Sequence, residues 1–339
     1  MTYPKDIYIP GIIGEHQNTG ELFSSQREVS HILESNFGKL ISVEQISGGL
    51  VHYVYRVTGA KRGAIIKIRG NNYSALPDIS MSSTDIQYEN RALQLMSIIE
   101  PSTFPQVLGF YSERSMIIMT DVMPNRCTLE NDLNDKRATS QDMKELGETV
   151  ARIHRKLEPL EVSTRDGKDD EVYNTDLFYR LGFRDNLVLN ETVEQLKQLP
   201  RQLILADLSP KNIGRGENGS ITICDLDSFF RGSTLYALAF LAGHILIHSL
   251  DDFDRGVQLL NGLLDGYRIE LPNADVDSLL FKRVALGVAL YRLNNPVIPY
   301  NLPLSEVEKL QKADTVLNLL NAQNLTWIKI IQELTASNK

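Results

Sequence analysis

The chain has 339 residues, of which 42% are hydrophobic and 23% are charged, proportions that are typical of a globular protein. Its formal net charge of -8 argues against a nucleic-acid-binding protein, because such proteins normally carry a basic excess. The two cysteines, Cys127 and Cys224, lie far apart in the sequence and form neither a disulfide framework nor a zinc-binding spacing. We expect both to be small, buried apolar residues. The length is sufficient for two domains.

Neither a signal peptide nor a membrane span is expected. The first residues contain no apolar core of the kind that signal peptides have. The most apolar stretch, residues 235–250, is short for a membrane span and contains His244 and His248. We therefore predict a core helix there and a cytoplasmic protein with no membrane partner. The two histidines have a spacing that permits metal binding on a helix, but no adjacent acid supports that interpretation.

The first third of the chain is predicted to be rich in strands. Residues 1–24 are expected to form an irregular lead-in, followed by a helix that Ser25 could cap. The predicted strands are 41–45, 51–57, 64–68 and 116–119. A helix is predicted over residues 85–99, with Ser83 or Thr84 as its cap.

The rest of the chain is predicted to be mostly helical. Apolar residues repeat along one helix face at Met143, Leu146, Val150, Ile153 and Leu157. His154 lies beside this face and is interpreted as a structural histidine. We expect breaks between helices at 272–277 and 294–303, and a lobe boundary near Pro124. The domains would be residues 1–123 and 124–339.

Lys67 and Glu89 are two charged residues in apolar surroundings. Lys67 lies in a strand that is otherwise apolar, and Glu89 falls on the apolar stripe of the 85–99 helix. A carboxylate that is buried without a partner costs several kcal/mol, as an order of magnitude. Lys67 is its natural partner, and the pair could contact phosphates. The alternative is that Lys67 points to water at a sheet edge and Glu89 reaches solvent.

Two further segments of the first lobe could contact a nucleotide. Ser47, Gly48 and Gly49 lie between two predicted strands, and glycine permits a close approach of backbone N–H groups to phosphate. An ordinary turn is the commoner explanation. Thr120 and Val122 follow a predicted strand and could offer backbone groups to a base, or could form an ordinary exit from that strand.

Residues 203–227 are the most informative segment. Asp207 is followed five residues later by Asn212, and Asp225 comes thirteen residues after that. A short strand leads into the loop, Pro210 stiffens it, and Asn218-Gly219 predicts a hairpin with a two-residue turn. This hairpin would bring Asn212 and Asp225 together. One carboxylate that orients a hydroxyl, with an amide and a second carboxylate that hold Mg²⁺, is the arrangement that phosphoryl transfer requires.

The ordered set of motifs resembles the aminoglycoside phosphotransferase and choline kinase superfamily. The similarity extends over residues 26–260, including residues 146–154, 205–212, 224–227 and 235–239. The resemblance implies an α+β, bilobed protein-kinase-like fold with a small β-rich N-lobe and a larger, mostly helical C-lobe. It also implies a small-molecule kinase.

The resemblance implies a role for each motif residue. Asp207 would be the catalytic base or orienting acid, and Lys67, held by Glu89, would contact the phosphates. The Mg²⁺ ligands would be Asn212 and Asp225, with Asp227 as a further ligand. Ser47, Gly48, Gly49, Thr120 and Val122 would contact the nucleotide. The cofactors would be ATP (or GTP) and Mg²⁺.

Four positions depart from the family pattern. Leu205 and Ser209 replace histidines of the catalytic loop, Ala206 replaces a glycine, and Ala237 replaces an acid. These changes leave the phosphate-handling residues in place, but they make a nucleotide-binding pseudokinase with a scaffold or sensor role the principal alternative. A protein kinase is less favoured, because no Ala-Pro-Glu sequence follows Asp225.

The phosphoryl acceptor is expected to be a hydroxyl of a small molecule, such as an aminoglycoside-like antibiotic or an amino-alcohol or sugar metabolite. Its contacts are expected from residues 158–200 and 255–300. The acidic run 166–171 could attract a cationic acceptor, although a solvated loop is the commoner explanation. The sequence leaves the choice between ATP and GTP and the oligomeric state open.

Overall fold

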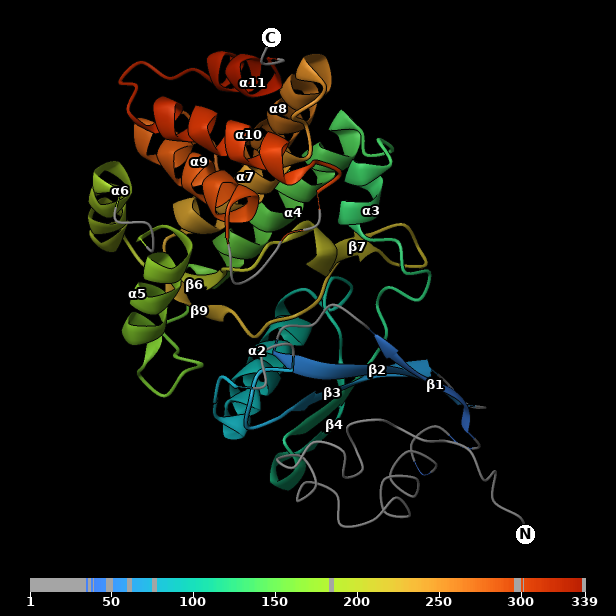
Figure 1. Cartoon of the computed structure of the whole chain (residues 1–339). Helices are drawn as coiled ribbons and strands as arrows, with labels where there is room; N and C mark the ends of the chain where they lie inside the picture. Colours follow the sequence, from blue (N-terminus) through green and yellow to red (C-terminus); the bar gives the residue numbers. More distant parts are fainter. Residues whose placement is uncertain are drawn as a thin grey trace. The chain divides into compact units, whose positions relative to one another are not determined.

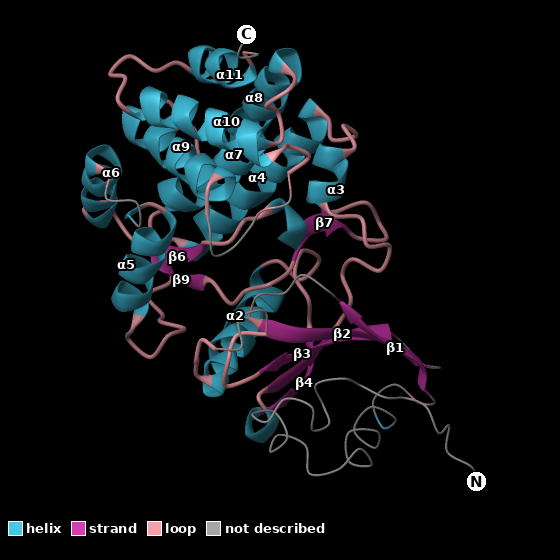
Figure 2. Cartoon of the chain, in the orientation of Figure 1, coloured by secondary structure: helices cyan, strands magenta, loops and turns pink. Residues whose placement is uncertain are grey.

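The computed structural model describes residues 35, 38, 40–46, 51–59, 63–74, 78–182, 186–295, 300 and 302–336. The chain forms two compact units, Met1–Pro124 and Asn125–Lys339, which we call unit 1 and unit 2. A five-stranded sheet lies in unit 1, and most helices lie in unit 2 (Figures 1 and 2). The prediction of a strand-rich first third and a helix-rich remainder is therefore confirmed. The predicted lead-in, the helix after Ser25, and Ser47, Gly48 and Gly49 lie outside the described residues.

Unit 1 is built on an antiparallel sheet with the strand order β1-β2-β3-β5-β4. The strands are β1 Leu40–Ile46, β2 His52–Gly59, β3 Gly63–Arg69, β4 Val107–Tyr111 and β5 Met116–Met119. Alternate residues of β2 and β3 face a hydrophobic core, which contains Tyr55, Val57, Ile66 and Ile68. The intervening residues of β3, Lys67 and Arg69, belong to the opposite face.

Helix α2, Ile86–Ile99, follows a short 3₁₀ turn, Ser83–Asp85. The predicted cap at Ser83 or Thr84 is wrong, because both residues lie within this turn and Asp85 is the N-cap residue of α2. The predicted apolar stripe is confirmed. Glu89 is buried on it with Ile86, Leu93 and Met96.

Unit 2 contains nine helices in its described part. They are α3 Leu129–Asn134, α4 Ser140–Leu157, α5 Asp169–Arg180, α6 Leu187–Lys197, α7 Thr234–Ile247, α8 Phe253–Glu270, α9 Leu279–Leu293, α10 Glu306–Leu320 and α11 Trp327–Thr335. The apolar face predicted for α4 is fully buried. Among the described helices, none combines the length and apolar character that a membrane span requires.

Glycine residues allow α4 and α8 to pack in close contact. A Cβ atom on Gly266 would lie 2.0 Å from the carbonyl oxygen of Lys144, and one on Gly147 would lie 2.2 Å from that of Leu263. Side chains at these positions are excluded, because the backbones themselves are in contact. The helix that carries the Leu146-Gly147 motif is therefore fixed against the rest of unit 2.

Two short antiparallel ladders flank the segments that contain Asp207, Asn212 and Asp225. Strand β6, Gln202–Leu205, pairs with β9, Phe229–Gly232, and β7, Ile213–Arg215, pairs with β8, Ile221–Ile223. The turn between β7 and β8 is longer than the predicted two residues. The N–H of Gly216 donates to the carbonyl of Ser220, so residues 217–219 form a three-residue loop, in which Gly219 has a φ of 79°.

The cysteine prediction is wrong. Cys127 is exposed, and Cys224 is only partly buried. Cys127 lies in the loop before α3, and Cys224 comes directly after β8, so neither occupies a core-facing position of a helix or strand.

Candidate functional site

Lys67 and Glu89 form a buried ion pair within unit 1. Lys67 Nζ lies 2.7 Å from Glu89 Oε1, and the side chains are 6% and 1% exposed. Strand β3 is bordered by β2 and β5, so Lys67 is on a central strand and not at a sheet edge. The pairing expected from the sequence is therefore present, whereas its role toward phosphate stays a prediction.

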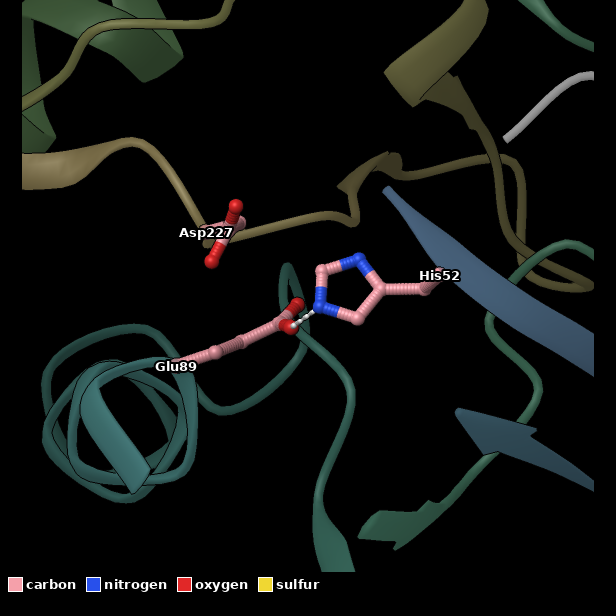
Figure 3. A group of neighbouring side chains, drawn as sticks. All are labelled: His52, Glu89 and Asp227. Carbon is pink, nitrogen blue, oxygen red and sulfur yellow. Dashed lines mark ion pairs between the residues drawn. The ribbon is translucent and has the colours of Figure 1, made fainter. Parts of the chain in front are cut away.

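The face of the sheet that carries Lys67 is polar. His52 is the cross-strand partner of Arg69, whose Nη1 lies 3.4 Å from His52 Nε2 and whose Nε donates a hydrogen bond to the carbonyl of Ser82. Figure 3 shows the imidazole of His52, on β2, directed toward Glu89, on α2, and His52 Nε2 lies 3.8 Å from Glu89 Oε2. Glu89 thus lies among cationic and titratable groups, which explains how a carboxylate is tolerated in the core.

The segment after β5 is held by side chains that the sequence did not single out. Arg56 Nε donates to Asp121 Oδ2 at 2.6 Å, and Arg56 Nη2 donates to the carbonyl of Met123 at 3.0 Å. The N–H of Thr120 donates to the carbonyl of Gln106. Among the described residues, no backbone partner engages the carbonyl of Thr120 or the N–H of Val122. These two groups stay candidates for contacts with a base.

In unit 2, two segments that carry the predicted catalytic residues run side by side. The N–H of Ala206 donates to the carbonyl of Ser228 at 2.9 Å, next to the β6–β9 ladder. The N–H of Cys224 donates to the carbonyl of Asn212 at 2.9 Å, next to the β7–β8 ladder. Between these two hydrogen bonds, the loop with Asp207 faces the segment with Asp225.

The side chains of Asn212 and Asp225 fit a hard divalent cation by their chemistry. Asn212 is buried and sits one residue before β7, while Asp225 is half-buried and comes two residues after β8. The backbone of Asn212 is hydrogen bonded to that of Cys224, and Asp225 is the residue that follows Cys224 in the chain. Amide and carboxylate oxygens are the ligands that Mg²⁺ prefers. Asp225 has a φ of 64°, in the left-handed region.

Asp207 lies in a cationic environment. Its side chain is 19% exposed, and its Oδ1 accepts a hydrogen bond from Ser209 Oγ. Burial alone would raise the pKa of Asp207, but the positive charges of Arg180, Lys211 and Arg292 outweigh it and hold the pKa below its ordinary value. Asp207 is therefore an ionised carboxylate at neutral pH and can accept hydrogen bonds.

Arg180 is a residue of this environment that sequence reasoning missed. It is buried at the end of α5, where its Nε lies 3.0 Å from Asp176 Oδ1 and its Nη1 donates to the carbonyl of Ala206 at 3.0 Å. Tyr236 donates a hydrogen bond to Asp176 Oδ2. The i,i+4 spacing of Asp176 and Arg180 indicates a helix pair. No local pattern links that pair to a loop 26 residues further along the chain.

Asp227 is oriented through its backbone. The buried Arg165 donates through Nη2 to the carbonyl of Asp227 and through Nε to the carbonyl of Phe229, at 3.2 Å for the latter. Asp227 is half-buried and lies on the same segment as Asp225. Its role as a further metal ligand stays a prediction.

The three histidines that the sequence singled out have structural partners. His154 is buried, and its Nδ1 lies 2.8 Å from the hydroxyl of Tyr267. His248 contacts the side chains of Asn134 and Tyr300. His244 contacts the carbonyl of Phe240 through Nδ1. These contacts agree with the structural interpretation of all three.

Comparison with known proteins identifies the fold. No protein-family sequence model matches the chain, and no curated protein matches it in sequence. Among solved structures, an amicoumacin kinase in complex with AMP-PNP, Ca²⁺ and its ligand is similar at a TM-score of 0.58 and 17% identity, over 87% of this chain and 93% of that one.

A choline kinase from Cryptosporidium parvum is similar at a TM-score of 0.52 and 10% identity, over 92% of this chain and 93% of that one. The predicted α+β, protein-kinase-like fold is thereby confirmed, and it is the fold of small-molecule kinases.

Proposed function

We propose that the protein is a Mg²⁺-dependent phosphotransferase that moves the γ-phosphoryl group of ATP or GTP to a hydroxyl of a small molecule. The observation that carries the proposal is the arrangement of Asp207, Asn212 and Asp225 on two facing segments, held by the hydrogen bonds Ala206–Ser228 and Asn212–Cys224. A solved protein of the same fold was obtained with a nucleotide analogue and a divalent cation, which agrees with this choice of cofactors.

In the proposed reaction, Asp207 accepts a hydrogen bond from the acceptor hydroxyl and orients its oxygen toward the γ-phosphorus. A new P–O bond forms to that oxygen, the bond to the β,γ-bridging oxygen breaks, and ADP or GDP leaves. The hydroxyl proton passes to Asp207 and then to solvent. Asn212 and Asp225, with Asp227, would hold Mg²⁺, which supplies charge neutralisation of the phosphates. The catalytic contribution is mainly orientation and electrostatic stabilisation.

Unit 1 would bind the nucleotide. Lys67 would contact the phosphates while Glu89 holds its ammonium in place, and the carbonyl of Thr120 and the N–H of Val122 would contact the base. We also propose that Ser47, Gly48 and Gly49 cover the phosphates. Residue chemistry and the kinase-like fold support these proposed roles.

The experiment that tests the function is a coupled ADP- and GDP-release screen with aminoglycosides, choline, methylthioribose, homoserine and sugar amines. Asp207→Asn should lower kcat about 10²–10⁴-fold, the usual range for a general base, and leave nucleotide affinity unchanged. Asp225→Asn should remove the Mg²⁺ dependence of nucleotide binding.

Two outcomes would favour other functions. Nucleotide binding without ADP release for any acceptor would indicate a scaffold or sensor, for which the alanine at position 237 and the leucine at position 205 are the motivating features. Phosphorylation of a generic protein substrate or of the chain itself would indicate a protein kinase.

A further inference from the structure

Arg292 forms no direct ion pair with an acid of the described chain, although its charge acts on Asp207. It lies near the end of α9 and is half-buried. Its contacts are one hydrogen bond to a histidine and the faces of aromatic rings, and none of the described carboxylates pairs with it. A partly desolvated cation without an anionic partner is unfavourable in a protein interior, so this site favours an anion from outside the chain.

The orientation of Arg292 is fixed. Its Nε donates to His244 Nε2 at 3.0 Å, and its guanidinium carbon lies 5.7 Å, 5.0 Å and 4.9 Å from the ring centres of Phe240, Tyr291 and Tyr300. The two terminal nitrogens make no hydrogen bond to the described residues. They retain the N–H groups that bind a carboxylate in a bidentate manner.

His244 does not compete for that anion, because it is neutral. Its Nδ1 faces the carbonyl of Phe240 at 2.8 Å, so this nitrogen must be the donor, and its Nε2 accepts from Arg292. Both ring nitrogens have these partners only in the neutral tautomer. Burial, with the neighbouring charge of Arg292, also lowers the pKa of His244 well below its ordinary value.

Arg292 belongs to the surroundings of Asp207. The ring of Phe240 is shared with Arg180, whose guanidinium carbon lies 4.3 Å from the ring centre. Arg180 Nη1 in turn lies 4.0 Å from Asp207 Oδ1. The two arginines differ in one respect: Arg180 is neutralised by Asp176, and Arg292 has no such partner.

Two acids of the run 166–171, which could have attracted a cationic acceptor, have partners within unit 2. Asp169 is buried and accepts hydrogen bonds from Ser163 Oγ and from the N–H of Arg231. Asp170 pairs with Arg201. Both residues belong to the first turn of α5, where acids stabilise a helix. These two acids are therefore engaged elsewhere and do not offset the charges of Arg180, Lys211 and Arg292 that act on Asp207.

We propose that Arg292 binds an anionic group of the phosphoryl acceptor, and that the acceptor is a hydroxy acid in which a carboxylate accompanies the hydroxyl. The inference rests on the proposed function, since it names the substrate class of the same site. It assigns Arg292 to recognition of the acceptor and not of the nucleotide. Tyr291 and Tyr300 would line the apolar part of the same molecule.

The test uses two series of related polyols, in which one member carries a carboxylate, one carries no charged group and one carries an ammonium group. The first is glycerate, glycerol and 2-amino-1,3-propanediol, and the second is glucuronate, glucose and glucosamine. Binding to the full chain is measured by thermal shift and by ADP release with Mg²⁺ and ATP, at about 10 mM, which exceeds the usual range of KM values. The variants are Arg292→Gln and Arg292→Lys. Arg155→Gln is the control, because Arg155 pairs with Glu270 on an exposed surface.

The expected result is that the carboxylate member of a series binds most tightly. Arg292→Gln should weaken that binding about 10–100-fold, the range for a hydrogen bond to a charged group, without a change in the KM of ATP. Arg292→Lys should retain part of the preference, which also covers the case that the glutamine variant does not fold. Arg155→Gln should behave as the wild type.

Three results would overturn the inference: preferential binding of the amine or neutral member, no binding of any carboxylate, or an equal effect of Arg292→Gln on ATP. The first of these, with ADP release, would leave the proposed kinase function intact. Conversely, carboxylate binding that depends on Arg292 without Mg²⁺-dependent nucleotide binding would remove the kinase function and leave the anion site.

Discussion

The guanidinium group of Arg180 contacts the loop with Asp207 at two points, the carbonyl of Ala206 at 3.0 Å and the carboxylate of Asp207 at 4.0 Å. The motif resemblance predicts a histidine at position 205 and an acid at position 237, where this chain has leucine and alanine. A buried arginine from α5 therefore supports the loop here, together with Ser209.

Removal of the charge of Arg180 should alter the pH dependence of the reaction. The charge of Arg180 opposes burial and lowers the pKa of Asp207, so Arg180→Met should raise that pKa. Because the proposed role of Asp207 requires the carboxylate form, the acid limb of the kcat/KM profile should move to higher pH. Arg180→Lys keeps a charge and should move the limb less. An unchanged acid limb in Arg180→Met would show that Asp207 does not control it.

Ser209 should contribute to turnover through its hydrogen bond to Asp207 Oδ1. Ser209→Ala should lower kcat by about 10–100-fold, since a hydrogen bond to a charged group is worth about 1.5–3 kcal/mol. The KM of the nucleotide should not change. Steady-state kinetics with ADP release measures both constants, and an effect on KM alone would place Ser209 in binding.

The Lys67–Glu89 pair should be important for folding as well as for activity. Glu89→Ala leaves a buried ammonium without its carboxylate and should cost about 3–5 kcal/mol in the free energy of unfolding. Glu113→Ala is the matched control, since Glu113 is 66% exposed and its pair with Arg114 should be worth at most about 1 kcal/mol. Urea unfolding of the full chain distinguishes the two; equal losses would contradict the burial argument.

The close contact between α4 and α8 predicts a steric effect. Gly266→Ala places a methyl group 2.0 Å from the carbonyl oxygen of Lys144, so the helices must separate. We expect a loss of about 1–3 kcal/mol, the usual cost of overpacking. Gly63→Ala is the control, because its nearest atom, the carbonyl oxygen of Val57, would lie at an ordinary 3.5 Å. Thermal unfolding of both variants measures the difference.

His154 should make the fold sensitive to acid. Burial lowers the pKa of His154 from 6.5 to about 3, so the imidazole stays neutral in the folded chain while the unfolded chain binds a proton below 6.5. The contribution of His154 to the free energy of unfolding is therefore complete above pH 6.5 and is lost as the pH falls toward 3. When the pH is lowered from about 7 to about 5, the free energy of unfolding of His154→Phe should fall by about 2 kcal/mol less than that of the wild type. Parallel losses in urea unfolding would refute the assignment.

The elements that carry the site could be predicted where a local pattern decides the structure. The alternation of β2, the stripe of α2 with Glu89, and the spacing of the α4 residues each required only neighbours in the sequence. Strand β4 was not predicted, since Gly109 interrupts its pattern and its register with β5 is irregular.

The surroundings of the site depend on contacts between distant parts of the chain. Arg180 and Arg292 come from α5 and α9, and only packing around Phe240 brings them together. The sequence indicated the segments 158–200 and 255–300 for acceptor contacts, but it could not select these two arginines. Asp207 and Asp225 were recognisable because their spacing and the hairpin between them are local.

The backbone at Asp225 restricts the amino acids that can replace this residue, independently of any metal. At a φ of 64°, asparagine and glycine are tolerated, whereas a β-branched side chain collides with the main chain. In a library of all substitutions at position 225, variants with asparagine or glycine should accumulate as folded protein. A nucleotide-binding assay should then distinguish them from the wild type. Variants with valine or isoleucine should already be lost at expression. Position 225 would therefore be restricted both by its backbone conformation and by its proposed role in nucleotide binding.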